Sequence, residues 1–363
     1  MGGQPHARAM LTGGLRCIHG ADVSAGGQCA RMIPMTFRTT RWTTLAAGSA
    51  TTLLIAGCGA GSADETDTAA EGNGLTVLAG FYPLEWAASR VGGDLASVSS
   101  LTPPGAEAHD LELTPQDVAA VSEADLLVYI EGFQPAIDQA AESEAGDSAW
   151  EAGQAANLTL TAEDEGHSEE EEGHSDDEAD SGEEAHADEE IVDPHFWLDP
   201  TRLADVGDAL AERMAELDPD NAATFEENAA AMRADLEELD GEMQEALADC
   251  SVDTLVTSHD AFGYLGDRYG FEVVGISGLE PSEEPSPAGL AEIAELVGER
   301  GVTTVYTETL VDPAVAETVA SEAGVETAVL DPIEGITDES AGDDYLQVMR
   351  ANLETLQQGQ SCA

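Results

Sequence analysis

The feature that most constrains the fold is a long amphipathic segment, residues 221–249, between two sets of shorter elements. Its apolar side chains recur at steps of three and four residues, which places them on one face of a helix. These side chains are Phe225, Ala229, Met232, Leu236, Leu239, Met243 and Leu247. At about 1.5 Å per residue the helix is roughly 40 Å long. We therefore predict that it bridges two lobes rather than covering one of them.

The segments on either side of this helix read as alternating strands and helices. Apolar runs predict strands at 75–80, 96–101, 125–130, 157–160, 253–258, 271–276, 303–307 and 326–330. Predicted helices occupy 83–92, 114–123, a stretch from 135, 199–217, 261–269, 287–299, 313–323 and 342–357. Such alternation is typical of parallel sheets. The predicted fold class is α/β, with two similar βα lobes, 75–218 and 250–363, joined by one long rigid helix, 219–249, beside an inter-lobe cleft.

The first 57 residues are interpreted as a leader that ends in a lipoprotein signal peptide. Arg38 and Arg41 precede an apolar run over 45–57, which is too short to span a bilayer. The sequence IAGC then places Cys58 where a bacterial lipobox has its lipid-modified cysteine. An ordinary secretory signal is the alternative. Met35 or Met32 is the expected start of translation, and residues 58–74 form a flexible tether from the lipid to the domain.

An acidic run over 163–190 interrupts the first lobe. It holds sixteen Asp or Glu residues, no cation, and the histidines His167, His174 and His186. Such a segment cannot bury enough apolar area to order itself. Two interpretations stay open: an auxiliary site that captures metal weakly, or a solvated insert suited to an acidic protein.

The net charge indicates which partners the protein can bind, and the cysteines indicate whether it is exported. The formal net charge is −62, and all twelve cations are arginine, so neither nucleic acid nor an anionic membrane surface is an expected partner. Membrane contact is expected through the lipid anchor alone. Cys250 and Cys362 are the cysteines of the mature domain, and in an exported protein they predict a disulfide.

Three histidines in the predicted lobes point to a metal site. His109 lies in a Pro/Gly-rich loop after a strand, His195 precedes a helix, and His259 follows a strand. Asp331 also follows a strand. Three imidazoles and a carboxylate in loops across one cleft suit a divalent transition metal.

A set of motifs in a fixed order makes this chain resemble a known family. It resembles the substrate-binding lipoproteins of bacterial high-affinity zinc ABC importers, the metal-binding cluster A-I, over about 75–363. The motifs are FYPL (81–84), PPGAEAHDLELTP (103–115), ADLLVY (124–129), DPHFWLDP (193–200), DPDNAATFEENA (218–229), TSHDAFGYL (257–265) and LDPIEG (330–335).

The resemblance implies a metal held between two lobes by His109, His195 and His259, with Asp331 as the carboxylate. It implies an extracytoplasmic, lipid-anchored protein, not an enzyme, that delivers Zn²⁺ to a membrane permease driven by a cytoplasmic ATPase. We expect a monomer. Glu308 and Glu107 are alternative or auxiliary ligands, although Glu308 is also expected to cap the helix near Asp312.

Zinc is the expected metal, because manganese-binding relatives place a glutamate at the position of His259 and three imidazoles suit zinc. The general order in which protein sites bind divalent metals would by itself also permit copper or nickel. Three alternatives of function remain: a manganese or other divalent-metal importer protein, a secreted zinc hydrolase with an open coordination position, and a surface adhesin, which some relatives are proposed to be. No HExxH motif supports the hydrolase.

Overall fold

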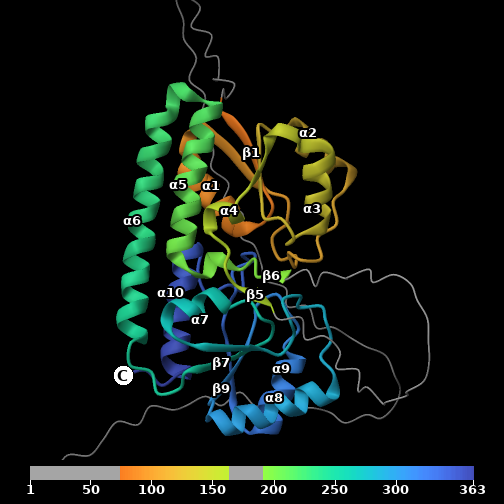
Figure 1. Ribbon diagram of the computed structural model, residues 1–363, viewed down its shortest axis with the longest axis vertical. Helices are drawn as coiled ribbons and strands as arrows, with labels where there is room; N and C mark the ends of the chain where they lie inside the picture. Colours follow the sequence, from red (N-terminus) through yellow and green to blue (C-terminus); the bar gives the residue numbers. More distant parts are fainter. Residues whose placement is uncertain (1–73, 163–190) are drawn as a thin grey trace, which may run out of the picture. The chain divides into compact units, whose positions relative to one another are not determined.

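The computed structural model describes residues 74–162 and 191–363, and all of them fall within one compact unit. Two four-stranded parallel sheets and a long helix dominate this unit (Figure 1). The leader, the tether, Cys58 and the acidic run with its three histidines lie outside the described residues. Among the helices of the described ranges, none combines the length and the apolar character needed to cross a bilayer.

The first sheet has the strand order β2-β1-β3-β4. Its elements are β1 (Leu75–Ala79), α1 (Tyr82–Gly92), β2 (Ala96–Ser100), α2 (Pro115–Glu123), β3 (Leu126–Tyr129), α3 (Pro135–Ala140), β4 (Ala149–Glu151) and α4 (Gly153–Ala156). A separate antiparallel pair, β5 (Thr161–Ala162) and β6 (Ile191–Val192), follows, and then come a 3₁₀ turn (Phe196–Leu198) and α5 (Pro200–Leu217).

The second sheet has the strand order β10-β9-β7-β8. Its elements are β7 (Thr254–Thr257), α7 (Gly263–Tyr269), β8 (Glu272–Gly275), α8 (Pro287–Arg300), β9 (Thr304–Thr307), α9 (Ala314–Ala323), β10 (Glu326–Val329) and α10 (Tyr345–Gly359). Read from its other edge, this order is β8-β7-β9-β10. In both sheets, therefore, the second strand of the lobe lies at one edge and is followed by the first, the third and the fourth. The prediction of two similar parallel α/β lobes is thus confirmed.

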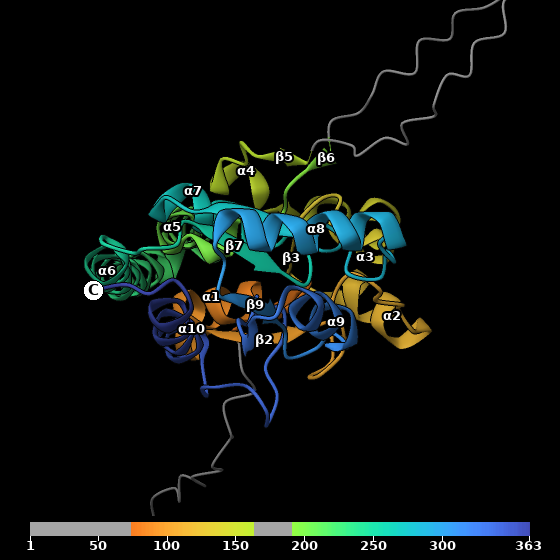
Figure 2. The same ribbon diagram turned by 90° about the horizontal axis from the view of Figure 1, so that it is seen from below.

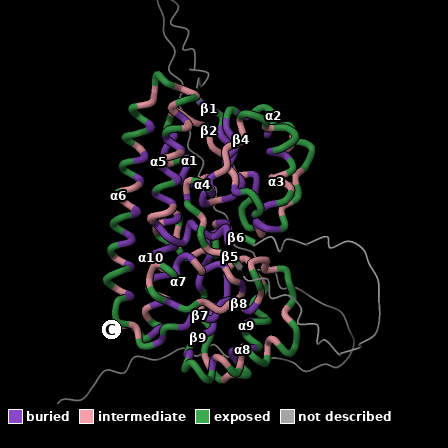
Figure 3. The backbone as a smooth tube through the Cα atoms, in the orientation of Figure 1, coloured by how far each residue is buried: buried purple, intermediate pink, exposed green. Residues whose placement is uncertain are grey.

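Helix α6 (Ala222–Leu247) is the long helix, and its predicted apolar face is buried. Figure 3 shows buried and exposed turns alternating along it. It contacts α1 and α5 beside the first sheet and α7 and α10 beside the second. Figure 2 shows α10 next to α6, whereas α8 and α9 lie further from it. One hydrophobic core includes residues of both sheets and of α6, so the bridging role is confirmed.

Polar contacts fasten α6 at both ends. Near its start, the Asn228 amide donates to the carbonyl of Val91 on α1 (2.9 Å). Further along, the carboxylate of Asp240 accepts two hydrogen bonds from the Arg268 guanidinium (2.6 and 2.7 Å) and one from the Tyr269 hydroxyl (3.0 Å). Because Asp240 is buried, this bidentate pair ties α6 to α7 in one geometry.

The disulfide between Cys250 and Cys362 is present, as predicted. It joins the chain just beyond α6 to the C-terminal end of the second lobe, over a separation of 112 residues. The backbone N–H of Val252 also donates to the carbonyl of Gln360 (3.1 Å), so the two segments are held by backbone as well as by sulfur.

One predicted strand is wrong: residues 157–160 form no strand, and β4 at 149–151 occupies the sheet edge instead. Side chains from other elements form hydrogen bonds with the backbone N–H and C=O groups of this segment, and these groups would otherwise pair with a neighbouring strand. The Arg202 guanidinium donates to the carbonyls of Ala156 and Asn157. The hydroxyl of Tyr264 accepts from the N–H groups of residues 159 and 160.

Candidate metal site

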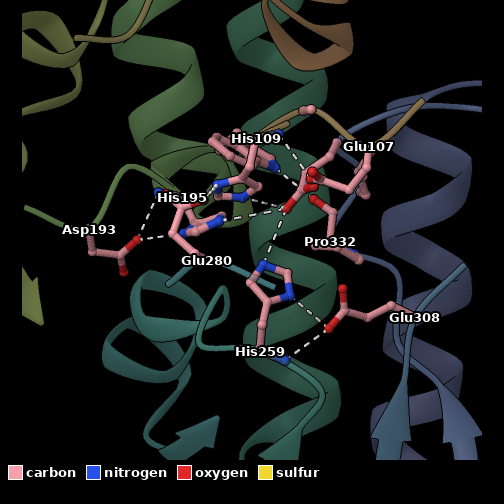
Figure 4. A network of polar contacts seen from close by, with 12 residues as sticks. Glu107, His109, Asp193, His195, His259, Glu280, Glu308 and Pro332 are labelled. Carbon is pink, nitrogen blue, oxygen red and sulfur yellow. Dashed lines mark hydrogen bonds and ion pairs between the residues drawn. The ribbon is translucent and has the colours of Figure 1, made fainter. Parts of the chain in front are cut away.

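The site forms where loops at the carboxyl ends of the strands meet, the usual place for a ligand in open parallel sheets. His109 lies in the loop between β2 and α2, His195 directly precedes the 3₁₀ turn before α5, and His259 follows β7. All three rings point toward one another in Figure 4. The fourth side chain of the cluster is Glu334, from the loop after β10. One ligand atom from each of these four residues lies within 4.8 Å of the others.

The geometry around the carboxylate is nearly symmetric. Its Oε1 atom lies 3.3 to 3.6 Å from the Nε2 atom of each ring, and the four side chains are at most 2% exposed. Glu334 Oε1 and the three Nε2 atoms have no hydrogen-bond partner among the described residues. Buried polar atoms are nearly always paired. Four such atoms that converge on one point therefore suit a shared cation.

The loop that carries His109 is fixed by its neighbours. Glu107 accepts hydrogen bonds from the backbone N–H groups of His109 and Asp110 (both 2.9 Å). The Gln134 amide donates to the carbonyl of Ala108 (2.9 Å), and the His109 ring packs edge-on against Phe133. The structure thus gives Glu107 a part in the turn, whereas the sequence suggested an auxiliary ligand.

His195 and His259 each have a carboxylate behind the ring. Asp193 Oδ1 accepts from the backbone N–H of His195 (2.9 Å) and lies 2.8 Å from its Nδ1. Glu308 Oε1 makes the same two contacts with His259, at 3.1 and 2.8 Å. Such carboxylates fix the ring orientation and the tautomer, so that Nε2 faces the site. Glu308 therefore does not join the cluster, and it is Asp312 that accepts from the first backbone N–H of the helix after it, that of Ala314 (3.0 Å).

The structure does not bring Asp331 into the cluster, contrary to the expectation. Its Oδ2 accepts from the Thr309 hydroxyl (2.7 Å), and its Oδ1 accepts from the backbone N–H of Ile333 (2.8 Å). Ile333 has φ of +62°, a left-handed conformation that is strained for a β-branched residue. Directly after Ile333, Glu334 rather than Asp331 lies with the histidines.

Contacts between the two lobes hold the loop that carries Glu334. The Trp197 indole N–H donates to the carbonyl of Pro332 (2.7 Å), and the Tyr345 hydroxyl donates to the carbonyl of Trp197 (2.5 Å). A cavity of about 250 Å³ lies beside this loop, between Glu334 and the segment after β2. Glu334 is the site residue that the sequence analysis missed, although it stands in the LDPIEG motif only three positions after Asp331.

The electrostatics of the cluster favour a charged metal-free state. Burial lowers the pKa of His109, but Glu280 and Glu334 outweigh it and raise this pKa to about 9. Burial likewise opposes protonation of His259, yet Glu308 and Glu334 raise its pKa well above the ordinary value. Burial would raise the pKa of Glu334, but the three imidazoles hold it well below its usual range.

Three imidazole nitrogens and one carboxylate oxygen form a donor set that suits zinc, since a harder ion such as manganese favours oxygen. A buried cluster of this kind, between two parallel-sheet lobes joined by a long helix, defines the class of two-lobed metal-binding proteins. Comparison with known proteins agrees with this class. The family model described as the zinc-uptake complex component A, periplasmic, matches residues 77–359. The chain belongs to this family.

Individual relatives are similar over most of the chain. The zinc-binding lipoprotein AdcA of Streptococcus pneumoniae is 36% identical over 290 residues, 78% of this chain and 55% of AdcA. The chain thus spans about half the length of that relative. The high-affinity zinc uptake system protein ZnuA of Bacillus subtilis is 34% identical over 321 residues, 87% of this chain and 97% of ZnuA.

Solved structures give the same result. Zn(II)-bound AdcA of Streptococcus pneumoniae superposes with a TM-score of 0.64 and 33% identity, over 79% of this chain and 58% of that one. The laminin-binding protein Lmb of Streptococcus agalactiae, described as bifunctional with adhesin and metal-transporting activity, has a TM-score of 0.66 and 30% identity, over 79% of this chain and 100% of that one.

Proposed function

We propose that the protein is an extracytoplasmic zinc-binding protein that captures Zn²⁺ and delivers it to an ABC-type membrane permease with an ATPase subunit. The observation that carries this proposal is the convergence of His109, His195, His259 and Glu334 on one buried point. Family membership supports the transport role. Cys58 is the proposed lipid anchor, the protein acts as a monomer, and the acidic run with His167, His174 and His186 remains a proposed auxiliary capture segment.

The geometry favours binding over hydrolysis. Catalytic zinc sites keep one coordination position open for water, whereas structural sites have four protein ligands. The cluster offers four ligands, all buried. The proposed cation is therefore cargo that the protein encloses.

Metal analysis tests the proposal directly. Protein purified without added metal is expected to carry zinc, and after chelation one Zn²⁺ per chain should bind tightly in competition with a chromophoric chelator. Manganese under the same conditions should bind much more weakly, because three of the four donors are imidazoles. Preferential manganese loading, or no tight zinc site, would contradict the proposal.

Zinc binding at pH 7 is expected to release protons, since a metal must displace protons from its ligands. The neighbouring carboxylates raise the pKa of His109 to about 9 and also raise the pKa of His259, so both shifts favour bound protons in the metal-free protein. Apparent zinc affinity should therefore rise as the pH is raised from 7 to 9. Calorimetry in buffers of different ionisation enthalpy measures this release, and the same heat in every buffer would refute it.

A further inference from the structure

Each of the three imidazoles has a carboxylate near its Nδ1 atom, on the side away from Glu334. The three pairs are His195 with Asp193 at 2.8 Å, His259 with Glu308 at 2.8 Å, and His109 with Glu280 at 3.3 Å. Metal-binding histidines are regularly oriented by such a partner. Two pairs follow this pattern closely, and the third is longer.

The third pair differs from the others in where its members come from. Asp193 lies two residues from His195, and Glu308 follows β9, the strand next to β7 that leads to His259. Glu280 lies in the loop between β8 and α8, in the second lobe, whereas His109 belongs to the first lobe. The contact between Glu280 and His109 therefore crosses from one lobe to the other.

The third pair also differs in exposure. The Glu280 side chain is 46% exposed, compared with 7% for Asp193 and 1% for Glu308. It nevertheless contacts a ring that is only 1% exposed. Glu280 thus lies between solvent and the imidazole of His109, and its contact does not have the alignment of a hydrogen bond.

We propose that Glu280 is the positioning residue that orients the His109 ring and links this orientation to the closed arrangement of the two lobes. The inference rests on the proposed zinc-binding function. The other two pairs each lie within one lobe, so the contact of Glu280 with His109 is the one of the three that depends on how the lobes are arranged. A small change in that arrangement frees the His109 ring from its orienting partner and leaves the other two rings held, so Glu280 controls chiefly how long zinc stays bound.

The expected size of the effect follows from the geometry. Loss of an orienting partner typically lowers metal affinity by about 10- to 100-fold. Exposure and screening weaken the contact of Glu280 with His109. Glu280→Ala is therefore expected to raise the zinc dissociation rate by about tenfold, at the lower end of that range.

The test compares three variants of the full chain by zinc titration and by stopped-flow dissociation into excess chelator. Glu280→Ala removes both the charge and the acceptor, and Glu280→Gln keeps an acceptor for the Nδ1 proton. Glu284→Ala removes the same charge from an exposed position on the same loop. A positioning role predicts faster dissociation in Glu280→Ala, partial recovery in Glu280→Gln and no change in Glu284→Ala.

Other outcomes overturn the proposal. If Glu280→Ala dissociates like the parent protein, the contact does not position His109. If all three variants change equally, and in the association rate, Glu280 contributes only to the general attraction of cations. The parent protein is titrated first, so failure of the zinc-binding function itself is seen before any variant is compared. The absorption spectrum of bound Co²⁺ should change most in Glu280→Ala, less in Glu280→Gln and not in Glu284→Ala, because it reports ligand geometry.

Discussion

Replacement of Glu334 by alanine is expected to lower zinc affinity by about a hundredfold or more. This loss is larger than the one expected when a metal ligand loses only the residue that orients it. The variant removes the only carboxylate of the cluster, whose Oε1 lies close to all three Nε2 atoms. Loss of this charge also lowers the pKa of His109 and of His259 and eases displacement of their protons. The measured change therefore underestimates what the ligand contributes. Competition titration with a chromophoric chelator gives the affinity.

Asp331→Asn is the matched control, because the sequence analysis placed Asp331 where the structure places Glu334. The amide keeps the size of the side chain, and its oxygen can still accept from Ile333. We expect an affinity loss of about tenfold at most, from a loosened loop. If Asp331→Asn lost as much affinity as Glu334→Ala, the carboxylate of the site would be wrongly assigned.

Removal of the disulfide is expected to lower the free energy of unfolding by about 3–5 kcal/mol, because the bond closes a long loop in the unfolded chain. The double variant Cys250→Ser/Cys362→Ser frees segments that are 112 residues apart. Urea unfolding gives the change in stability. Zinc affinity should stay within about twofold where the variant is folded, since neither cysteine belongs to the metal cluster and the backbone bond between Val252 and Gln360 remains.

Reduction of the parent protein is the control for this variant. With dithiothreitol present, the parent and the double variant should unfold at the same urea concentration. An unchanged midpoint in the double variant without reductant would show that the backbone contacts alone hold the C-terminus. A change in the zinc affinity of the double variant, measured at a low temperature where this variant is folded, would instead show that the disulfide supports the geometry of the site.

Much of the fold could be predicted because its signals are local. The apolar face of α6 and the starts of α2 and α5 are set by neighbouring residues, and they lie as expected. Thr114 caps α2 and Asp199 caps α5 at the predicted helix starts. The error at 157–160 arose from contacts with Arg202 and Tyr264, which are distant in sequence. Periodicity in a short apolar run does not report such competition for the backbone.

The three histidines were accessible to sequence reasoning because two of them follow strands and parallel strands end at one sheet edge. The carboxylate of Glu334 could not be found in this way, because its position depends on the backbone of the loop after β10. A left-handed Ile333 has no local signal, since this conformation is rare for isoleucine and is held by Asp331 and by Trp197 from the first lobe. The orienting role of Glu308 was missed for the same reason, as it depends on how adjacent strands align.

The small sheet formed by β5 and β6 has a consequence for how the chain can vary. Thr161 pairs with Val192 and Ala162 pairs with Ile191, and the next N–H, from Asp193, donates to the carbonyl of Leu160 (2.9 Å). The pairing of β5 with β6 therefore brings residues 162 and 191 together, a few residues before His195. The entropic cost of joining two such paired ends grows only with the logarithm of the number of residues between them. A change in that number is therefore expected to cost little stability and to leave the backbone at His195 in place.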